Sequence, residues 1–333
     1  MKNKAKKMVS WLLRALPWLV ALGLLGFLFY KIPPQDLWSS YRRASLLPFL
    51  LFAVVYFFAI ALLDTWGLSR VLSKFSSPIR LAELWPGRCV SYLISLVNYN
   101  AGQVGLAGYL KRKKDFSFFK SVGSIFFVTV TDLYWIIFFA FLGSFFVDFR
   151  LEGLALSLWI KRIGFIALLA FFLHLAFWNR WFDKILPFKF HFAFADWIRG
   201  RHLFQAFHQA ELKDYFFTAL RRLPLHLIFI SSMWVLVRLF GGTISWGDTF
   251  ATVPIIFLLG ALPITPGGLG AVQIATVELL KDKVVYPHPE EMLFAMSLAW
   301  MGTNYLLKTL VGLIYFRSTK PDATHQEPES ALS

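Results

Sequence analysis

Long apolar segments recur along this chain of 333 residues, and they constrain its fold more than any other feature. A helix needs about 20 consecutive apolar residues to cross the hydrocarbon core of a bilayer. The strands of a membrane barrel alternate in hydrophobicity, whereas these segments are apolar throughout. The sequence therefore predicts an all-α polytopic membrane protein with about six transmembrane helices. The segments that reach or approach the required length are residues 11–30, 47–64, 119–147, 154–178, 223–240 and 291–316.

The composition supports a membrane location and argues against nucleic acid as a partner. Hydrophobic residues make up 57% of the chain, which is outside the range of soluble domains. The net charge of +15 comes largely from Lys and Arg clusters between apolar segments, the pattern of cytoplasmic loops beside an anionic leaflet. We therefore expect membrane lipids, and no nucleic acid, as partners. The clusters are Lys2, Lys4, Lys6 and Lys7, then Lys111 to Lys114, then Arg221 and Arg222.

The positive loops also set the expected orientation. With the N-terminus inside, residues 65–115 and 179–222 are cytoplasmic and hold most of the loop Lys and Arg. This predicts a multi-pass protein of the plasma (inner) membrane with both termini in the cytoplasm. Residues 1–316 are expected to form a single transmembrane domain, and residues 317–333 a disordered cytoplasmic tail.

Two further apolar regions are each interrupted by a glycine-containing break. The first has an arm at 89–97 and a break at 98–108, and the second has arms at 249–262 and 269–280. At about 1.5 Å per residue, the longest of these arms reaches about 21 Å, against a hydrocarbon core of about 30 Å. Each region is therefore predicted to be a re-entrant helical hairpin, which is tolerated where protein or a wet cavity surrounds the turn.

The placement of the two hairpins predicts an inverted repeat. Three of the predicted crossings lie between them, and an odd number puts the hairpins on opposite faces of the membrane. Each hairpin is also flanked by spans, giving two corresponding units at approximately 40–150 and 215–316. Glycine breaks in corresponding places of two halves indicate a transporter-like site near the middle of the membrane.

The breaks themselves supply most of the candidate substrate-binding residues. Backbone N–H groups at a glycine turn that opens a helix can bind an anion, since the helix dipole acts in the same direction. Close helix packing through small residues is the alternative explanation for the spaced glycines. The candidates are Asn98, Asn100, Gly102, Gln103 and Gly105 in the first half, and Thr265, Pro266, Gly267, Gly268, Gly270 and Gln273 in the second.

A carboxylate in the third predicted span adds a further candidate. Asp132 lies near the middle of that span, where its charge costs several kcal/mol unless it is paired, hydrated or protonated. It is expected either to contact substrate or to pair with Asn304 or Lys308, which lie at comparable depth in the last span. His174 and His226 are expected near the cytoplasmic ends of their spans, at the interface rather than in a reaction centre.

The sequence carries no signature of a common enzyme class. It has no zincin motif, no P-loop and no nucleophile elbow. Cys89 is the only cysteine, which excludes an internal disulfide and a cluster of thiolate metal ligands. We therefore expect no enzymatic activity, no cofactor and no bound metal.

The residues at the two breaks resemble the lysylphosphatidylglycerol synthase transmembrane-domain family of flippase-like membrane proteins. Leu262 to Gly270 looks like the Pro-Gly-Gly-x-Gly signature of that family, and the first half matches at Asn98 to Gly105, at Tyr109 to Arg112 and at Asp132. The resemblance implies movement of a lipid head group across a membrane, with the hairpins forming the cavity. Full synthases of the family add a soluble transferase domain, whereas a polar tail follows Phe316 here, so only the translocation module is expected.

Two departures from the family pattern concern acidic residues. Gln273 stands where relatives often have Glu, and Leu106 stands where they often have an acid. Both weaken the case for acid-dependent coupling or a cationic head group as substrate. The leading hypothesis is translocation of a phospholipid or a polyprenyl (lipid-linked) precursor, with an anionic phospholipid or lipid-linked phosphate as substrate. The alternative is a non-transporting membrane subunit that scaffolds a lipid-modifying or glycosyltransferase enzyme, with that enzyme or a homo-oligomer as partner.

Overall fold

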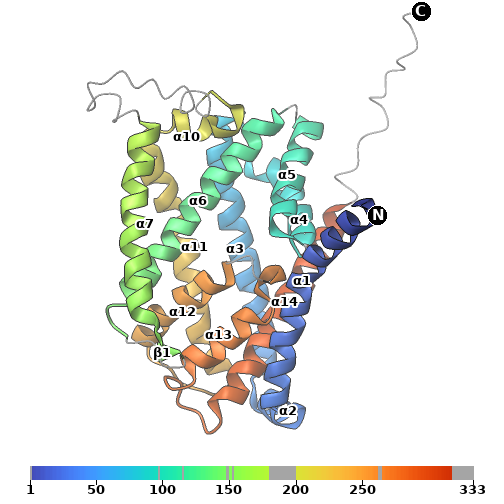
Figure 1. The fold of residues 1–333 in the computed structure, drawn as a ribbon, viewed down its shortest axis with the longest axis vertical. Coiled ribbons are helices and arrows are strands. Elements are labelled where there is room, and N and C mark those ends of the chain that lie inside the picture. Colours follow the sequence, from blue (N-terminus) through green and yellow to red (C-terminus); the bar gives the residue numbers. More distant parts are fainter. Residues whose placement is uncertain are drawn as a thin grey trace, which may run out of the picture.

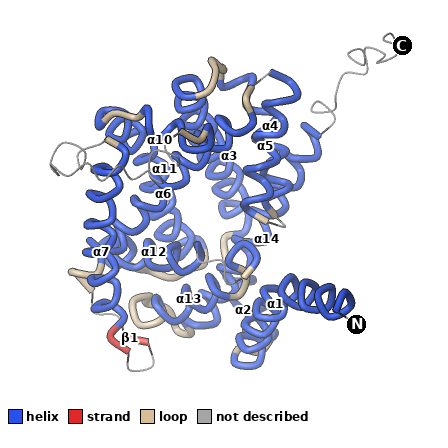
Figure 2. The backbone as a smooth tube through the Cα atoms, turned by 45° about the horizontal axis from the view of Figure 1, so that its top comes forward, coloured by secondary structure: helices blue, strands red, loops and turns tan. Residues whose placement is uncertain are grey.

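The computed structural model is a bundle of helices, as Figure 1 and Figure 2 show from two directions. The predicted tail at 317–333 lies outside the described residues. The one sheet of the described chain joins two short antiparallel strands, with Arg150 opposite Ala155. The all-α prediction is therefore confirmed for the part of the chain that the structure describes, which is residues 2–96, 98–114, 116–147, 150–151, 154–179, 200–261 and 265–316.

The helices follow one another with short connections. The elements are α1 (Lys2–Lys31), α2 (Pro34–Arg43), α3 (Leu46–Phe75), α4 (Leu81–Ser95), α5 (Tyr99–Lys114), α6 (Phe118–Gly143), β1 (Arg150–Leu151), β2 (Leu154–Ala155), α7 (Leu156–Trp178), α10 (Gln205–Gln209), α11 (Leu212–Leu239), α12 (Trp246–Ala261), α13 (Ala271–Leu280) and α14 (Pro289–Phe316), with 3₁₀ turns at His202–Phe204 and Pro266–Gly268.

Four of the described helices are long and apolar enough to cross a membrane: α3, α6, α7 and α11. A fifth is added if Leu16–Lys31 and Pro34–Arg43 count as one span, although they meet at an angle of 81°. Two prolines, Pro33 and Pro34, cause that bend, because proline lacks the N–H that would continue the helix. The last predicted span, α14, is not among the four, because Asn304 and Lys308 interrupt its apolar sequence.

Three helices are longer than the spans that the sequence predicted, and the first of them, α1, begins at Lys2 rather than at residue 11. Helix α3 continues to Phe75 rather than ending at residue 64, and α11 begins at Leu212 rather than at residue 223. At the start of α11, the Asp214 carboxylate accepts a hydrogen bond of 2.9 Å from the Glu211 N–H, which caps the helix. In these extra turns, charged residues that the sequence had placed in loops belong to helices.

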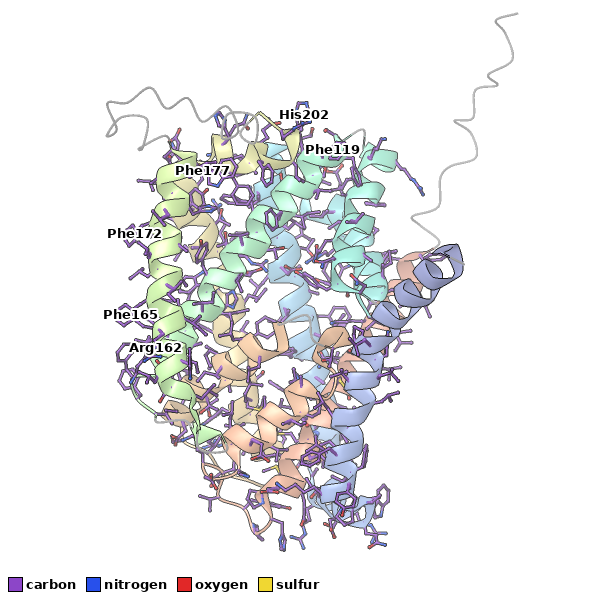
Figure 3. The ribbon with its side chains drawn as sticks, in the orientation of Figure 1. Phe119, Arg162, Phe165, Phe172, Phe177 and His202 are labelled. Carbon is purple, nitrogen blue, oxygen red and sulfur yellow. The ribbon has the colours of Figure 1, made fainter. Side chains whose placement is uncertain are left out.

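The buried core has two main parts. One is formed mainly by side chains of α1, α2, α6 and α11 to α14, among them Leu236 and Phe294, with single contributions from α3 and α7. The other is formed by α3 to α7 and α10, with Phe127 and Phe207 at its centre. Outside this core α7 presents a broad apolar face, on which Phe165 and Phe172 are 59% and 53% exposed and point away from the bundle (Figure 3). Such a face suits contact with lipid chains.

Two pairs of short helices stand out between the long ones. Helices α4 and α5 pack against each other, and so do α12 and α13. In Figure 1 the α4–α5 pair lies in the upper half of the molecule and the α12–α13 pair in the lower half. Their breaks differ: a glycine turn separates α12 from α13, whereas Ala101 to Gly105 are part of α5.

The prediction of a glycine-containing break at 98–108 is therefore wrong, because residues from Tyr99 onward, including Gly102 and Gly105, belong to α5. Gly102 lies where α5 approaches α4 closely: a Cβ atom there would come within 2.7 Å of the Ser91 carbonyl oxygen. A Cβ atom at Gly105 would come within 2.8 Å of the Ile94 side chain. These glycines therefore permit close helix packing, which was the alternative explanation for their spacing.

Four alternating charges form a ring of ion pairs at the C-terminal end of α13. Lys31 of α1 contacts Glu278 at 3.3 Å and Glu290 at 2.8 Å, while Lys281 contacts the same two carboxylates at 2.6 Å and 3.3 Å. Hydrogen bonding to Glu278 raises the pKa of the Lys281 ammonium above its ordinary value. The ring joins α1, α13 and α14 at one end of the bundle.

Replacing Gly102 with Ala should loosen the α4–α5 pair. The new methyl group would collide with the Ser91 carbonyl, so the purified protein should melt several degrees lower than wild type in detergent. Gly108→Ala is the matched control, because no atom lies within 4 Å of its Cβ position and alanine favours a helix over glycine by about 1 kcal/mol. Equal melting temperatures for the two variants would contradict the packing role.

Candidate functional site

Four charged side chains from four helices meet inside the bundle. Arg88 of α4 donates to the Asp64 carboxylate of α3 at 2.8 Å from Nε and 2.5 Å from Nη2. Arg222 of α11 donates from Nη1 to the other Asp64 oxygen at 2.8 Å. The same guanidinium donates to both oxygens of Asp132 in α6, at 2.7 Å and 2.6 Å. We call Asp64, Arg88, Asp132 and Arg222 the buried ion network.

The side chains of the buried ion network are largely buried, and their formal charges balance. The side chains of Asp64, Arg88 and Arg222 are each less than 10% exposed. Charges at such positions are tolerated only when opposite charges and hydrogen bonds compensate them. Here two carboxylates face two guanidiniums, so their formal charges sum to zero. Tyr92 adds a donor at 2.8 Å to Asp64, and the Gln103 side-chain oxygen accepts from Arg88 at 2.9 Å.

Asp132 points into the bundle, but its partners are not those that the sequence predicted. It pairs with Arg222 and lies 3.1 Å from His226 Nε2, rather than contacting Asn304 or Lys308 of the last span. The reason is the early start of α11, which brings Arg222 from a supposed loop into the helix interior.

Of the two histidines that were expected at the membrane interface, one lies elsewhere. His226 is buried in the middle of α11, so its predicted interfacial position is wrong. His174 lies four residues before the end of α7, where its Nε2 is 3.1 Å from the Tyr215 hydroxyl oxygen.

Beside the network lies a cavity of about 370 Å³. Side chains of α3, α6 and α11 to α14 line it together with the glycine turn, and most of them are apolar or aromatic, including Tyr56, Phe229 and Trp300. A mostly apolar pocket with a few convergent polar groups is the usual form of a small-ligand site. The residues that the sequence predicted and that do line the cavity are Gly267, Gly268, Gln273, Asn304 and Lys308.

The ionisable side chains that line the cavity are basic or phenolic rather than acidic. Lys308 and His226 line it, together with two tyrosine hydroxyls, and no carboxylate is found among its described lining residues. Within the described part of the chain, Lys308 makes no ion pair and no side-chain hydrogen bond. Because the adjacent ion network is neutral, the charge of Lys308 is left uncompensated. The cavity is therefore suited to an anion.

The second glycine turn borders this cavity with backbone. Gly267 and Gly268 have φ angles of 58° and 77°, a region that other residues rarely adopt. The predicted open N–H donors are partly occupied: Gly268 donates to the Thr265 carbonyl at 3.3 Å, and Gly270 donates to the Gln273 side-chain oxygen at 2.7 Å. Gly270 also packs against α1, since a Cβ atom there would lie 2.8 Å from that of Leu24.

The remaining predicted residues lie outside the cavity lining. Asn98 is exposed and accepts a hydrogen bond of 3.0 Å from the Ala101 N–H, which caps α5. Asn100 is exposed, and Thr265 is buried with no hydrogen-bond partner for its hydroxyl among the described residues. Pro266 begins the 3₁₀ turn. The first-half and second-half candidates therefore do not form one site, although Gln103 joins the ion network.

Sequence reasoning missed four of the central residues: Asp64, Arg88, Arg222 and His226. A signal for the first three was available, since an ionisable residue at the edge of an apolar segment can belong to the span when a partner of opposite charge lies in another. The described residues contain no group of three His, Cys, Asp or Glu side chains suited to a metal ion.

Replacing Arg222 should destabilise the protein far more than replacing Arg221, the residue before it. Arg222→Leu leaves two buried carboxylates short of their partner, which should cost about 3–5 kcal/mol or abolish the folded yield. Arg221→Leu is the control, because that guanidinium lies over the Phe217 ring outside the network, and its loss should stay within about 1 kcal/mol. Size-exclusion profiles and melting curves of the purified variants measure the difference, and equal losses would show that the network is not required.

The comparison with known proteins agrees with this architecture. Residues 14–312 match the family described as lysylphosphatidylglycerol synthase TM region. No curated protein matches the chain, and no solved structure does. The match runs from α1 to α14 and indicates a membrane function related to lipids. The chain belongs to the lysylphosphatidylglycerol synthase TM region family.

Proposed function

We propose that this protein moves a lipid with a phosphate-bearing head group across the membrane, with the cavity as the head-group site. One observation carries the proposal: the cavity is lined by Lys308 and His226 without a carboxylate among its described residues, next to an ion network that is already neutral. The family membership supplies the link to lipids. An ammonium group in a partly apolar pocket is a common partner for phosphate.

The size and lining of the cavity fit a head group better than a whole lipid. Its volume of about 370 Å³ lies near the lower end of the range for small-ligand sites. The acyl chains would then remain in the bilayer while Lys308, Asn304 and Gln273 receive the head group. Because two N–H groups of the glycine turn are already hydrogen-bonded, the main anion contact in this proposal is Lys308 rather than the turn.

We further propose that α4–α5 and α12–α13 are re-entrant hairpins that enter from opposite faces, in an inverted repeat. Their arms support this, since they have 15 and 16 residues in the first pair and 16 and 10 in the second. Their positions in opposite halves of Figure 1 support it too. In this arrangement the protein lies in the plasma (inner) membrane with both termini in the cytoplasm, and the exposed Lys111 and Arg112 lie at the cytoplasmic face.

Thiol labelling from each side tests the hairpin arrangement. Arg80 and Trp246 lie at the starts of the two hairpins and are exposed, with 89% of the Arg80 side chain and 47% of Trp246 accessible. Cys89 is fully buried and can stay in place as an unreactive background. An impermeant reagent should label Arg80→Cys from the cytoplasmic side and Trp246→Cys from the opposite side. Labelling of both from one side would contradict the inverted repeat.

Replacing Lys308 tests the head-group site. In vesicles containing the purified protein, Lys308→Met should slow the transfer of labelled phosphatidylglycerol between leaflets about tenfold or more, since a charge-assisted contact contributes roughly 1.5–3 kcal/mol. Lys308→Arg should retain part of the rate. Lys213→Met is the control, because that lysine is 62% exposed beside Glu211 and far from the cavity lining. A replacement of Gly268 would not test the head-group site as directly. Its φ of 77° strains any other residue, so a loss of transfer could come from the altered turn.

The outcome separates the two hypotheses. Wild-type rates for Lys308→Met would refute the head-group site. Failure of the wild-type protein to move any lipid, together with its co-purification with a lipid-modifying or glycosyl-transferring enzyme, would favour the scaffold hypothesis.

A further inference from the structure

Building on the proposed function, we infer that the anionic head group enters the cavity together with a proton, and that His226 binds this proton. The observation behind this inference is that His226 belongs both to the cavity lining and to the surroundings of the ion network. Among the described residues that line the cavity, His226 is the one with a hydrogen bond or ion pair to the buried ion network. It therefore links the charge of a ligand in the cavity to the charge of the network.

The hydrogen bond to Asp132 fixes which nitrogen is available. Asp132 accepts two hydrogen bonds from Arg222 and is an ionised carboxylate, which can only accept. The His226 Nε2 atom, 3.1 Å from Asp132 Oδ1, must therefore carry a hydrogen. In the neutral ring Nδ1 is then the basic nitrogen, and a proton added there makes an imidazolium that keeps its bond to Asp132.

Charge balance makes proton binding depend on the ligand. With a neutral imidazole the network sums to zero, because Asp64 and Asp132 face Arg88 and Arg222. Protonation of His226 would add a buried positive charge to that of Lys308, which is unfavourable. A singly charged anion in the cavity would attract both groups and so lower the cost of adding the proton. Each binding event therefore strengthens the other by the same factor.

The groups around His226 come from each element packed against it. Helix α6 contributes Asp132, its own helix α11 contributes Arg222, and α14 contributes Lys308 and Tyr305. Helix α3 contributes the Tyr56 hydroxyl, while the described lining residues of α12 and α13 carry no charge. Lys308 is therefore the alternative proton acceptor, and the experiment has to distinguish the two.

Calorimetry with short-chain phosphatidylglycerol provides the test, because this phosphodiester exchanges no proton near neutral pH. Binding to the purified protein, measured in buffers of different ionisation enthalpy, should show uptake of up to about one proton. The affinity should rise roughly 5- to 20-fold from about pH 8 to about pH 6. His226→Gln preserves an N–H donor for Asp132 but cannot titrate, so it should bind the lipid without proton uptake and with little pH dependence.

Control variants and a second measurement make each outcome decisive. His174→Gln removes a histidine that lies outside the cavity lining and should behave like wild type. If His226→Gln does not fold, the side-chain nitrogen NMR signals of the wild-type protein should show protonation of a cavity histidine on lipid addition. Binding without proton uptake, or uptake that persists in His226→Gln, would overturn this inference and leave the proposed function standing. Absence of any phosphatidylglycerol binding by the wild type would overturn both.

Discussion

Ion pairing inside the helix bundle is the interaction on which the rest of this structure depends. Asp64, Arg88, Asp132 and Arg222 come from four helices, and each would be costly to bury without the others. Arg222 is central, because its guanidinium bridges both carboxylates. The network therefore fixes how α3, α4, α6 and α11 pack, and it places an electrically neutral wall beside the cavity. Because the network has no net charge, it does not compensate the positive charge of Lys308 in the cavity.

Much of the architecture could be predicted from the sequence, because apolar length and glycine breaks act locally. The long helices, the all-α class and the second glycine turn follow from such patterns. The position of Asn304 and Lys308 beside that turn does not, since the sequence suggests them only as partners of Asp132. The ends of α3 and α11 could not be predicted in this way, because a charged residue within an apolar segment looks like the start of a loop until its partner is known. The partner of Asp132 is Arg222, 90 residues away in the sequence. Similarly, glycine is compatible with both a turn and close helix contact, and only the packing against Ser91 decides the role of Gly102.

Gln273 connects the family resemblance with the chemistry of the cavity. Its side-chain oxygen caps α13 through the Gly270 N–H, a role that the glutamate expected there from the family resemblance would also perform. A glutamate would, however, add a negative charge to the wall that Lys308 shares. The amide preserves the cap while leaving Lys308 without a counter-ion among the described residues. The neutral amide therefore fits the proposed anionic head group better than a glutamate would.

The polar character of α14 has a consequence for how the protein is made. Asn304 and Lys308 keep this helix below the apolarity of the other long helices, although it packs across the bundle against α2, α3, α4 and α13. Insertion into a bilayer is governed largely by the apolarity of each segment, so α14 is expected to be poorly retained by itself. It follows α2, α3, α4 and α13 in the sequence, so these packing partners are synthesised before it. The helix that brings Lys308, and with it the charge of the cavity, would then be held in the membrane by partners that are already there.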